Sequence, residues 1–144
     1  MQLSRFSDLG LRAMMRLAVS SSAEERVTTK IIARQVNASE HYVAKAVSKL
    51  VDLGLVDSHR GRSGGIFLTT RGRSATVGEI VRGLEGAAEV VECDGDHPCP
   101  LSAACRLRRV LDQAQEEFYR HLDGYSLDDL VNPQLRKILH LSAR

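Results

Sequence analysis

The sequence predicts a mainly α-helical protein with a small β-wing: a winged helix-turn-helix region followed by a long dimerisation helix, assembled as a homodimer. Three observations support this fold class. Two short helical patterns are joined by a tight polar turn, a glycine-rich hairpin pattern follows them, and a long helical pattern near the C-terminus carries an apolar stripe. We expect the chain to divide into residues 1–75 and residues 76–144.

Charge is distributed unevenly along the 144 residues, although the net charge is only +2. Residues 1–75 carry 12 Lys and Arg against 6 Asp and Glu, or +6, whereas residues 76–144 carry 8 against 12, or −4. A basic front half is the pattern expected of a region that binds a polyanion. The short length leaves no room for a large enzyme core, and the absence of Trp indicates an aliphatic core.

The N-terminal residues do not read as a signal peptide, because Arg5, Arg12 and Arg16 interrupt the apolar segment. No apolar run in the sequence is long enough to span a bilayer. We therefore expect a cytoplasmic protein, whose thiols stay reduced and available to a metal.

A first helix is predicted from Ser4 to Val19. One face of it carries Phe6, Leu9, Ala13 and Leu17, and Ser4 or Ser7 can cap its start. Asp8 falls in the first turn, where a carboxylate interacts favourably with the helix dipole. The residues alone favour this ordinary role for Asp8.

Two further helices, about Thr29–Gln35 and Ser39–Leu53, are separated by the turn 36–38 and predict a helix-turn-helix. The buried face of the second should carry Val43, Val47, Leu50 and Val51. The side chains left outside it are Ser39, His41, Tyr42, Lys45, Ser48 and Lys49. These types read bases and phosphates in DNA, although a solvated face on an ordinary helical hairpin would look similar.

A basic-tipped β-hairpin follows directly, with strands at Val56–His59 and Ile66–Leu68 around the tip RGRSGG. A hairpin in this position is the layout of a winged helix. Arg60, Arg62 and Ser63 at its tip suit the minor groove or its phosphates. A nucleotide-binding loop is the alternative, but the tip has no Walker lysine and no strand-to-helix context.

The acidic half begins with a predicted helix from Thr76 to about Leu84, where Thr76 and Glu79 match a capping box. A long helix is predicted from about Leu101 to Leu122, and a closing helical segment over Ser126–Val131. The apolar stripe of the long helix consists of Leu107, Leu111, Ala114, Phe118 and Leu122. Because too little chain remains to cover it, we expect the same helix of a second subunit as its partner.

Between these helices, the sequence CDGDHPCPLSAAC holds all three cysteines at two equal spacings. Thiolates are preferred ligands of zinc and of iron–sulfur clusters, and both need four ligands, so one ligand must come from elsewhere. The metal-free alternative is a set of unrelated thiols. Cys93, Cys99 and Cys105 are therefore candidate metal ligands.

Several motifs together resemble a family of small dimeric winged-helix regulators that hold an iron–sulfur cluster in a three-cysteine loop, with NsrR and IscR among its members. They are SRFSDLGLRAMMRLA, LVDLGLVDSHRGRSGGIFLT, TVGEIVRGLEG and CPLSAACRLR. The resemblance implies a transcriptional repressor that binds double-stranded operator DNA and carries a 4Fe-4S cluster, with 2Fe-2S possible.

The fourth ligand separates branches of this family. IscR-like members place a histidine three residues after the last cysteine, where this chain has Arg108. The chain resembles the NsrR branch in having Asp8 and an acidic loop. This implies nitric oxide sensing, with Asp8 of the partner subunit as fourth ligand. His97 and Glu85 remain rival ligands.

Three other functions share some of these features. A zinc-dependent regulator would share the winged helix, as would a regulator that responds to iron or redox status. A small iron–sulfur electron carrier would share the cysteines but has no need of a winged helix. No constellation for hydrolysis is present in the sequence, so we expect no enzyme.

Overall fold

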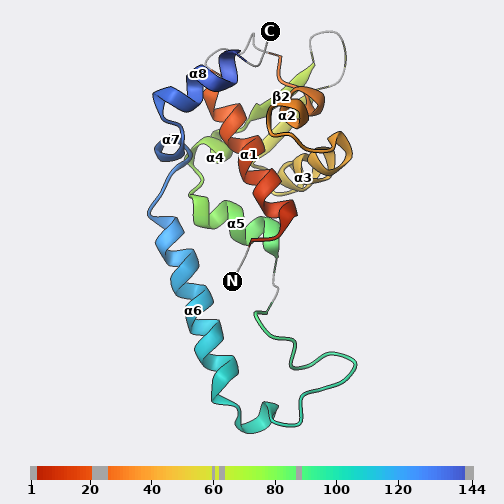
Figure 1. Cartoon of the computed structure of the whole chain (residues 1–144), viewed down its shortest axis with the longest axis vertical. Coiled ribbons are helices and arrows are strands. Elements are labelled where there is room, and N and C mark those ends of the chain that lie inside the picture. The colour runs from red at the N-terminus through yellow and green to blue at the C-terminus, as the bar shows by residue number, and fades with distance from the viewer. Residues whose placement is uncertain (1–2, 21–25, 60, 62–63, 87–88, 142–144) are drawn as a thin grey trace.

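The computed structural model describes residues 3–20, 26–59, 61, 64–86 and 89–141. In Figure 1 most helices gather in one part of the molecule, and a single long helix projects from it together with an irregular loop. The elements are α1 (Arg5–Val19), α2 (Thr29–Gln35), α3 (Glu40–Asp52), β1 (Val56–His59), β2 (Gly65–Leu68), α4 (Thr70–Ser74), α5 (Val77–Glu85), the 3₁₀ helix η1 (Ser102–Ala104), α6 (Arg106–Asp123), α7 (Leu127–Leu130) and α8 (Pro133–Leu141). The winged helix-turn-helix prediction is confirmed.

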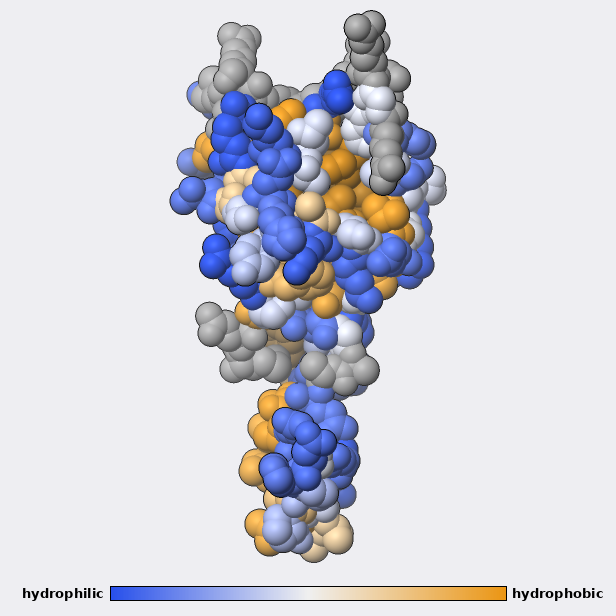
Figure 2. Space-filling view, turned by 90° about the vertical axis from the view of Figure 1, so that its right-hand side faces the viewer, coloured by the Kyte–Doolittle hydropathy of each residue, from blue (hydrophilic) through white to orange (hydrophobic). Residues whose placement is uncertain are grey.

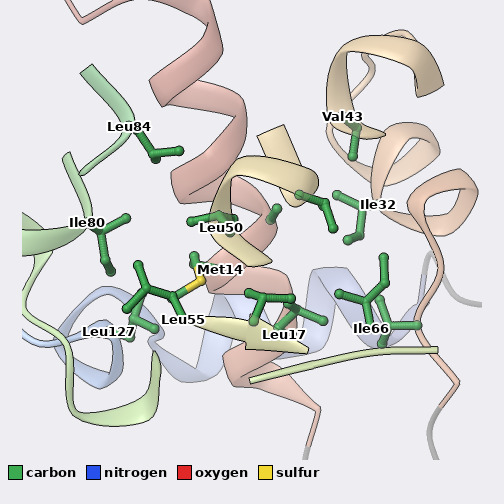
Figure 3. Packing of buried hydrophobic residues seen from close by; sticks show 14 of the residues in the cluster. Met14, Leu17, Ile32, Val43, Leu50, Leu55, Ile66, Ile80, Leu84 and Leu127 are labelled. Carbon is green, nitrogen blue, oxygen red and sulfur yellow. The ribbon is translucent and has the colours of Figure 1, made fainter. Parts of the chain in front are cut away.

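The helix-turn-helix is organised around α1, which packs against α3 and α5. Ser4 caps α1 by accepting a hydrogen bond from the amide of Ser7, and Thr28 caps α2 in the same way. The predicted inner faces are mostly buried, with Phe6 and Val51 half-buried. Figure 3 shows Met14 and Leu17 of α1 in one cluster with Leu50 of α3. Local periodicity and caps were therefore sufficient to place these helices.

The wing is an antiparallel pair in which Val56 lies opposite Leu68 and His59 opposite Gly65. The amide of Ile66 donates to the carbonyl of Val27, so the chain before α2 runs along the outer side of β2. This second hydrogen-bonded neighbour fixes the wing to the helix-turn-helix.

Helix α4 was not predicted, because its five residues carry no apolar stripe. Its start is capped by Thr69, and Gly72 lies directly against the chain that leads into β1. A Cβ atom at Gly72 would lie 1.9 Å from the carbonyl oxygen of Leu55. Close backbone packing, rather than local propensity, places this turn of helix.

The C-terminal segments return to the helix-turn-helix. Leu127 of α7 joins the main core, and Leu139 of α8 packs with Val19 at the end of α1 (Figure 3 shows Leu127). The predicted division of the chain at residue 75 stays a prediction.

A buried arginine supports this arrangement. Arg16 is 2% exposed, and its guanidinium donates to Gln35 at 2.6 Å and to Ser20 at 2.8 Å. The side-chain amide nitrogen of Gln35 in turn donates to the backbone carbonyl of Leu139 at 2.8 Å. In the sequence Arg16 appears only as a charge that interrupts an apolar run, whereas in the fold it joins α1, α2 and α8.

Helix α6 begins at Arg106, five residues later than predicted. The backbone of Cys105 is extended, with φ −78° and ψ 117°, so the preceding 3₁₀ turn cannot continue into α6.

Most of α6 is exposed to solvent. Of its 18 residues, all within the described part of the chain, Tyr119 alone is buried. Leu107 and Val110 are 60% and 55% exposed. Figure 2 shows hydrophobic residues along one edge of the projecting part; their pairing with a second subunit stays a prediction.

At the start of α5, Thr76 accepts from the amide of Glu79, but the Glu79 carboxylate accepts from Arg71 at 2.8 Å, so only half of the predicted capping box forms. Among the described helices, none is both long and apolar enough to cross a membrane.

Candidate metal centre and nucleic-acid interface

The cysteine loop joins α5 to α6 and lies beside the end of α6 that is far from the helix-turn-helix (Figure 1). Within it, the amide of Cys99 donates to the carbonyl of Cys93 at 3.0 Å, and the amide of Ser102 donates to the carbonyl of Cys99 at 3.1 Å. These two backbone bonds fold the loop back on itself. Cys105 follows η1 and occupies the cap position of α6.

All three cysteines are free thiols. Cys93 is buried, and Cys99 and Cys105 are half-buried. Burial raises the pKa of the Cys93 thiol, the positive charge of Arg108 lowers it, and the nearby charges of Cys99, Asp94 and Cys105 raise it again. Cys93 is therefore close enough to both other cysteines for their charges to act on it.

A hollow of about 310 Å³ lies beside Cys93. Its lining residues are Glu89, Glu92, Cys93, Asp94 and Gly95. Among the described residues, no three His, Cys, Asp or Glu side chains converge closely enough to hold one metal ion. In a 4Fe-4S cluster each cysteine binds a different iron, so the thiolates need only border a common space. Of the three cysteines, Cys93 alone lines this hollow, while Cys99 and Cys105 lie in the same loop. The thiol chemistry suits a cluster, and bringing all three thiolates to one is part of the proposal below.

The structure also shows the surroundings of Arg108 and of the two rival ligands. Arg108, which stands where the IscR-like pattern has histidine, forms ion pairs with Glu89 at 2.7 Å and Asp94 at 2.8 Å. The Glu85 carboxylate accepts from the backbone amide of Ser4 at 2.8 Å. His97 is exposed within the loop.

Asp8 lies in the first turn of α1, where it forms an ion pair of 2.7 Å with Arg12. Figure 1 shows the start of α1 beside α5, while the cysteine loop lies toward the opposite end of α6. The fold of one chain thus does not bring Asp8 to its own cysteines. Its role as a ligand from the partner subunit stays a prediction.

The proposed DNA-reading face lies on α3. Ser39, His41, Tyr42, Lys45 and Ser48 are exposed, and Lys49 is half-buried. The opposite face, with Val43, Val47 and Leu50, is buried in the core, as the helical period predicted. The wing-tip residues Arg60, Arg62 and Ser63 lie outside the described residues.

Sequence reasoning missed two arginines near this face. The guanidinium carbon of Arg5 lies 5.9 Å from the centre of the Tyr42 ring, and Arg26 donates to the carbonyl of Gly61 in the wing at 3.3 Å. Both contacts join residues that are 35 or more positions apart, so no local pattern reveals them. The uneven charge of the front half was the only signal.

Comparison with known proteins finds a family and several relatives that match most of this chain. Residues 3–133 match the Rrf2 family, described as an iron-dependent transcriptional regulator. The HTH-type transcriptional repressor NsrR of Streptomyces coelicolor is 51% identical over 131 residues, which cover 91% of this chain and 88% of the relative. The HTH-type transcriptional regulator NsrR of Geobacillus kaustophilus is 38% identical over 143 residues, covering 96% and 97%.

A solved structure is similar as well. CymR, the global cysteine regulator of B. subtilis, matches with a TM-score of 0.64 and 35% identity, over 90% of this chain and 95% of that chain.

Proposed function

The chain belongs to the Rrf2 family of transcriptional regulators, and we propose that it is a nitric-oxide-sensing repressor that releases operator DNA when its iron–sulfur cluster reacts. Membership of this family makes it a regulator of transcription and not an enzyme. Since its proposed ligand is operator DNA, we place it in the cytoplasm.

One observation carries the proposal: α3, a helix-turn-helix helix with an exposed polar face, and a loop with three free thiols occur in one chain. An electron carrier has no use for the exposed polar face of α3. The similarity to proteins named NsrR supports nitric oxide as the signal.

Cys93, Cys99 and Cys105 would hold the cluster, with Asp8 of the partner subunit as the fourth ligand. A bound cluster would supply iron that reacts with nitric oxide, most readily at the iron held by oxygen, because a carboxylate is a harder and weaker ligand of cluster iron than a thiolate. The chain's own contribution is to keep Cys93 buried, to order the loop through the Cys99 amide, and to anchor it to α6 through Arg108.

The link to DNA follows from the position of the loop. In a dimer paired through α6, the loop of one subunit and α1 of the other would share the cluster as a common anchor. Loss of that anchor would change the spacing of the two α3 helices, which must fit successive major grooves. Repression would then end.

The test is a titration of the anaerobically purified protein with nitric oxide, with absorbance and DNA binding followed in parallel. We expect a brown protein whose visible absorbance and DNA affinity fall together. Cys99→Ala should be colourless, folded and unresponsive.

Other outcomes would identify the alternatives. A colourless wild-type protein that contains zinc would exclude the cluster. A brown protein that keeps its DNA affinity during the titration, but loses it on oxidation or iron removal, would indicate a regulator of redox or iron status instead.

A further inference from the structure

Apart from the ion pairs of Arg108 with the cysteine loop, helix α6 contacts the rest of the chain mainly through α5, at one end. Its single buried residue, Tyr119, lies near the C-terminal end and packs against Val77 and Val81 of α5. At the other end Leu107 is exposed. Figure 1 shows the same arrangement, with α6 extending away from α5 and the helix-turn-helix. The contact between α5 and α6, called the joint below, therefore sets the direction of α6 relative to the helix-turn-helix.

The joint has an ion pair at its centre. One terminal nitrogen of Arg82, on α5, donates to both carboxylate oxygens of Asp123 at 2.8 Å, and the other donates to Glu116 at 3.2 Å. The hydroxyl of Thr76 donates to Asp123 at 3.0 Å. Hydrogen bonding to Arg82 holds the pKa of Asp123 below its ordinary value, so the pair stays charged at neutral pH.

Two further contacts fix the position of α5 relative to α6. The Arg82 guanidinium lies over the Tyr119 ring, 4.9 Å from its centre, so the same side chain binds two successive turns of α6. One turn before Arg82 on α5, a Cβ atom at Gly78 would lie 2.1 Å from an Asp123 oxygen and 2.6 Å from the carbonyl oxygen of Tyr119. The two helices thus touch through backbone and cannot approach more closely.

The angle between α5 and α6 matters because α6, whose 18 residues span about 27 Å, is long enough to pair two chains. With α6 fixed in such a dimer, a change of that angle swings each α3 about the contact with α5, and a displacement of about 3.4 Å already equals the rise of one base pair. If two chains pair along α6, the angle at the joint fixes how far each α3 lies from the two-fold axis.

We propose that Arg82 and Asp123 are specificity-determining residues that set the spacing of operator half-sites by fixing the angle between α6 and the DNA-binding region. They touch no DNA in this scheme. The inference rests on the proposed DNA-binding dimer, but it does not depend on the cluster or on nitric oxide.

The experiment is a selection from a random DNA duplex library, carried out with the anaerobically purified full chain and followed by sequencing. Wild-type protein should recover two-fold symmetric sites with one half-site spacing. Arg82→Ala should recover the same half-site sequence with a broadened range of spacings.

Binding to the selected site gives the magnitude. Inserting one base pair between the half-sites should weaken wild-type binding on the order of tenfold to a hundredfold, and Arg82→Ala binding by about threefold or less. Arg82→Lys should be intermediate, since one ammonium group cannot contact Asp123, Glu116 and Tyr119 together. Gly78→Ala should shift or broaden the preferred spacing, because its methyl group pushes α6 away from α5.

Arg120→Ala is the matched control. Arg120 lies on α6 and pairs with Glu117 of the same helix, and both side chains are exposed. It should keep the wild-type spacing. Asp123→Asn, which is nearly isosteric, covers the case in which Arg82→Ala does not fold.

Two results separate the possible failures. A wild-type protein that recovers single half-sites would contradict the dimeric repressor itself. A sharp wild-type optimum that persists unchanged in folded Arg82→Ala and Asp123→Asn would overturn the role of the joint.

Discussion

Arg108 and Asp94 form an ion pair of 2.8 Å that ties the first turn of α6 to the residue directly after Cys93. The second terminal nitrogen of Arg108 donates to Glu89 at 2.7 Å, before the first cysteine. An arginine stays protonated and cannot bind a metal. At the position where the IscR-like pattern places a histidine ligand, this chain therefore has a residue that connects three segments around the thiols.

Replacing Arg108 by alanine should loosen the cysteine loop even in the protein without a cluster. We expect amide hydrogen exchange across residues 89–99 of the cluster-free protein to increase by about tenfold, because two charge-assisted hydrogen bonds are lost at a site that solvent screens. The cluster-loaded variant should also lose iron faster to a chelator.

Arg109→Ala is the control for this change, since Arg109 is the adjacent exposed residue on α6. It should leave both measurements unchanged. Equal exchange in the Arg108 and Arg109 variants would show that the ion pairs of Arg108 do not order the loop.

Asp8 should influence the cluster although it lies away from the loop of its own chain. If it binds across the dimer, Asp8→Ala should still assemble a cluster on three thiolates, but a less stable one with altered nitric oxide kinetics. Asp8→Cys should tighten the cluster and blunt the response. The measurements are loss of visible absorbance over time and stopped-flow nitrosylation.

A separate variant distinguishes this role from the ion pair seen on α1. Arg12→Ala removes the partner of Asp8 without removing the carboxylate. If Asp8 acts only as a helix-start carboxylate, Asp8→Ala and Asp8→Cys should both match wild type in cluster stability, kinetics and operator affinity, and Arg12→Ala should behave like them.

DNA binding should depend steeply on salt, because residues 1–75 carry +6. Six to ten phosphate contacts per dimer would lower the binding constant on the order of a thousandfold or more between 50 and 200 mM salt. Lys45→Ala should reduce the slope of the log–log plot by about two per dimer if each Lys45 meets a phosphate. A flat salt profile for the wild-type protein would contradict a phosphate-binding front face.

Base preference should follow other residues of the same helix. His41→Ala or Tyr42→Ala should change the selected half-site sequence, whereas Arg62→Ala in the wing should weaken binding to every sequence or to A/T-rich flanks. None of these changes should alter the cluster spectrum. Loss of the cluster in the Arg62 variant would show that the wing had been misassigned.

Gly72→Ala should destabilise the protein strongly, because its methyl group would collide with the carbonyl of Leu55. Overpacking against backbone typically costs about 1–3 kcal/mol in the free energy of unfolding. Arg73→Ala, at the exposed neighbouring position, should cost far less. Chemical denaturation followed by circular dichroism measures both, and equal midpoints for the two variants would contradict the close contact.

The sequence by itself determined the local elements and the chemical character of the site. Helices α1, α2 and α3 and the wing lie within one or two residues of their predicted bounds, because their caps and apolar periods are set by residues three or four positions apart. The three cysteines were equally visible, since metal-binding chemistry depends on residue type and spacing.

Tertiary structure alone decided what these elements do to one another. Arg16 meets Gln35 and Arg82 meets Asp123 across 19 and 41 positions, and no local period links such pairs. Helix α4 exists because Gly72 fits against Leu55, and α6 starts late because Cys105 is extended. The physical reason is the same in each case: burial and ion pairing depend on which distant segments the fold brings into contact, and local sequence fixes only the segments themselves.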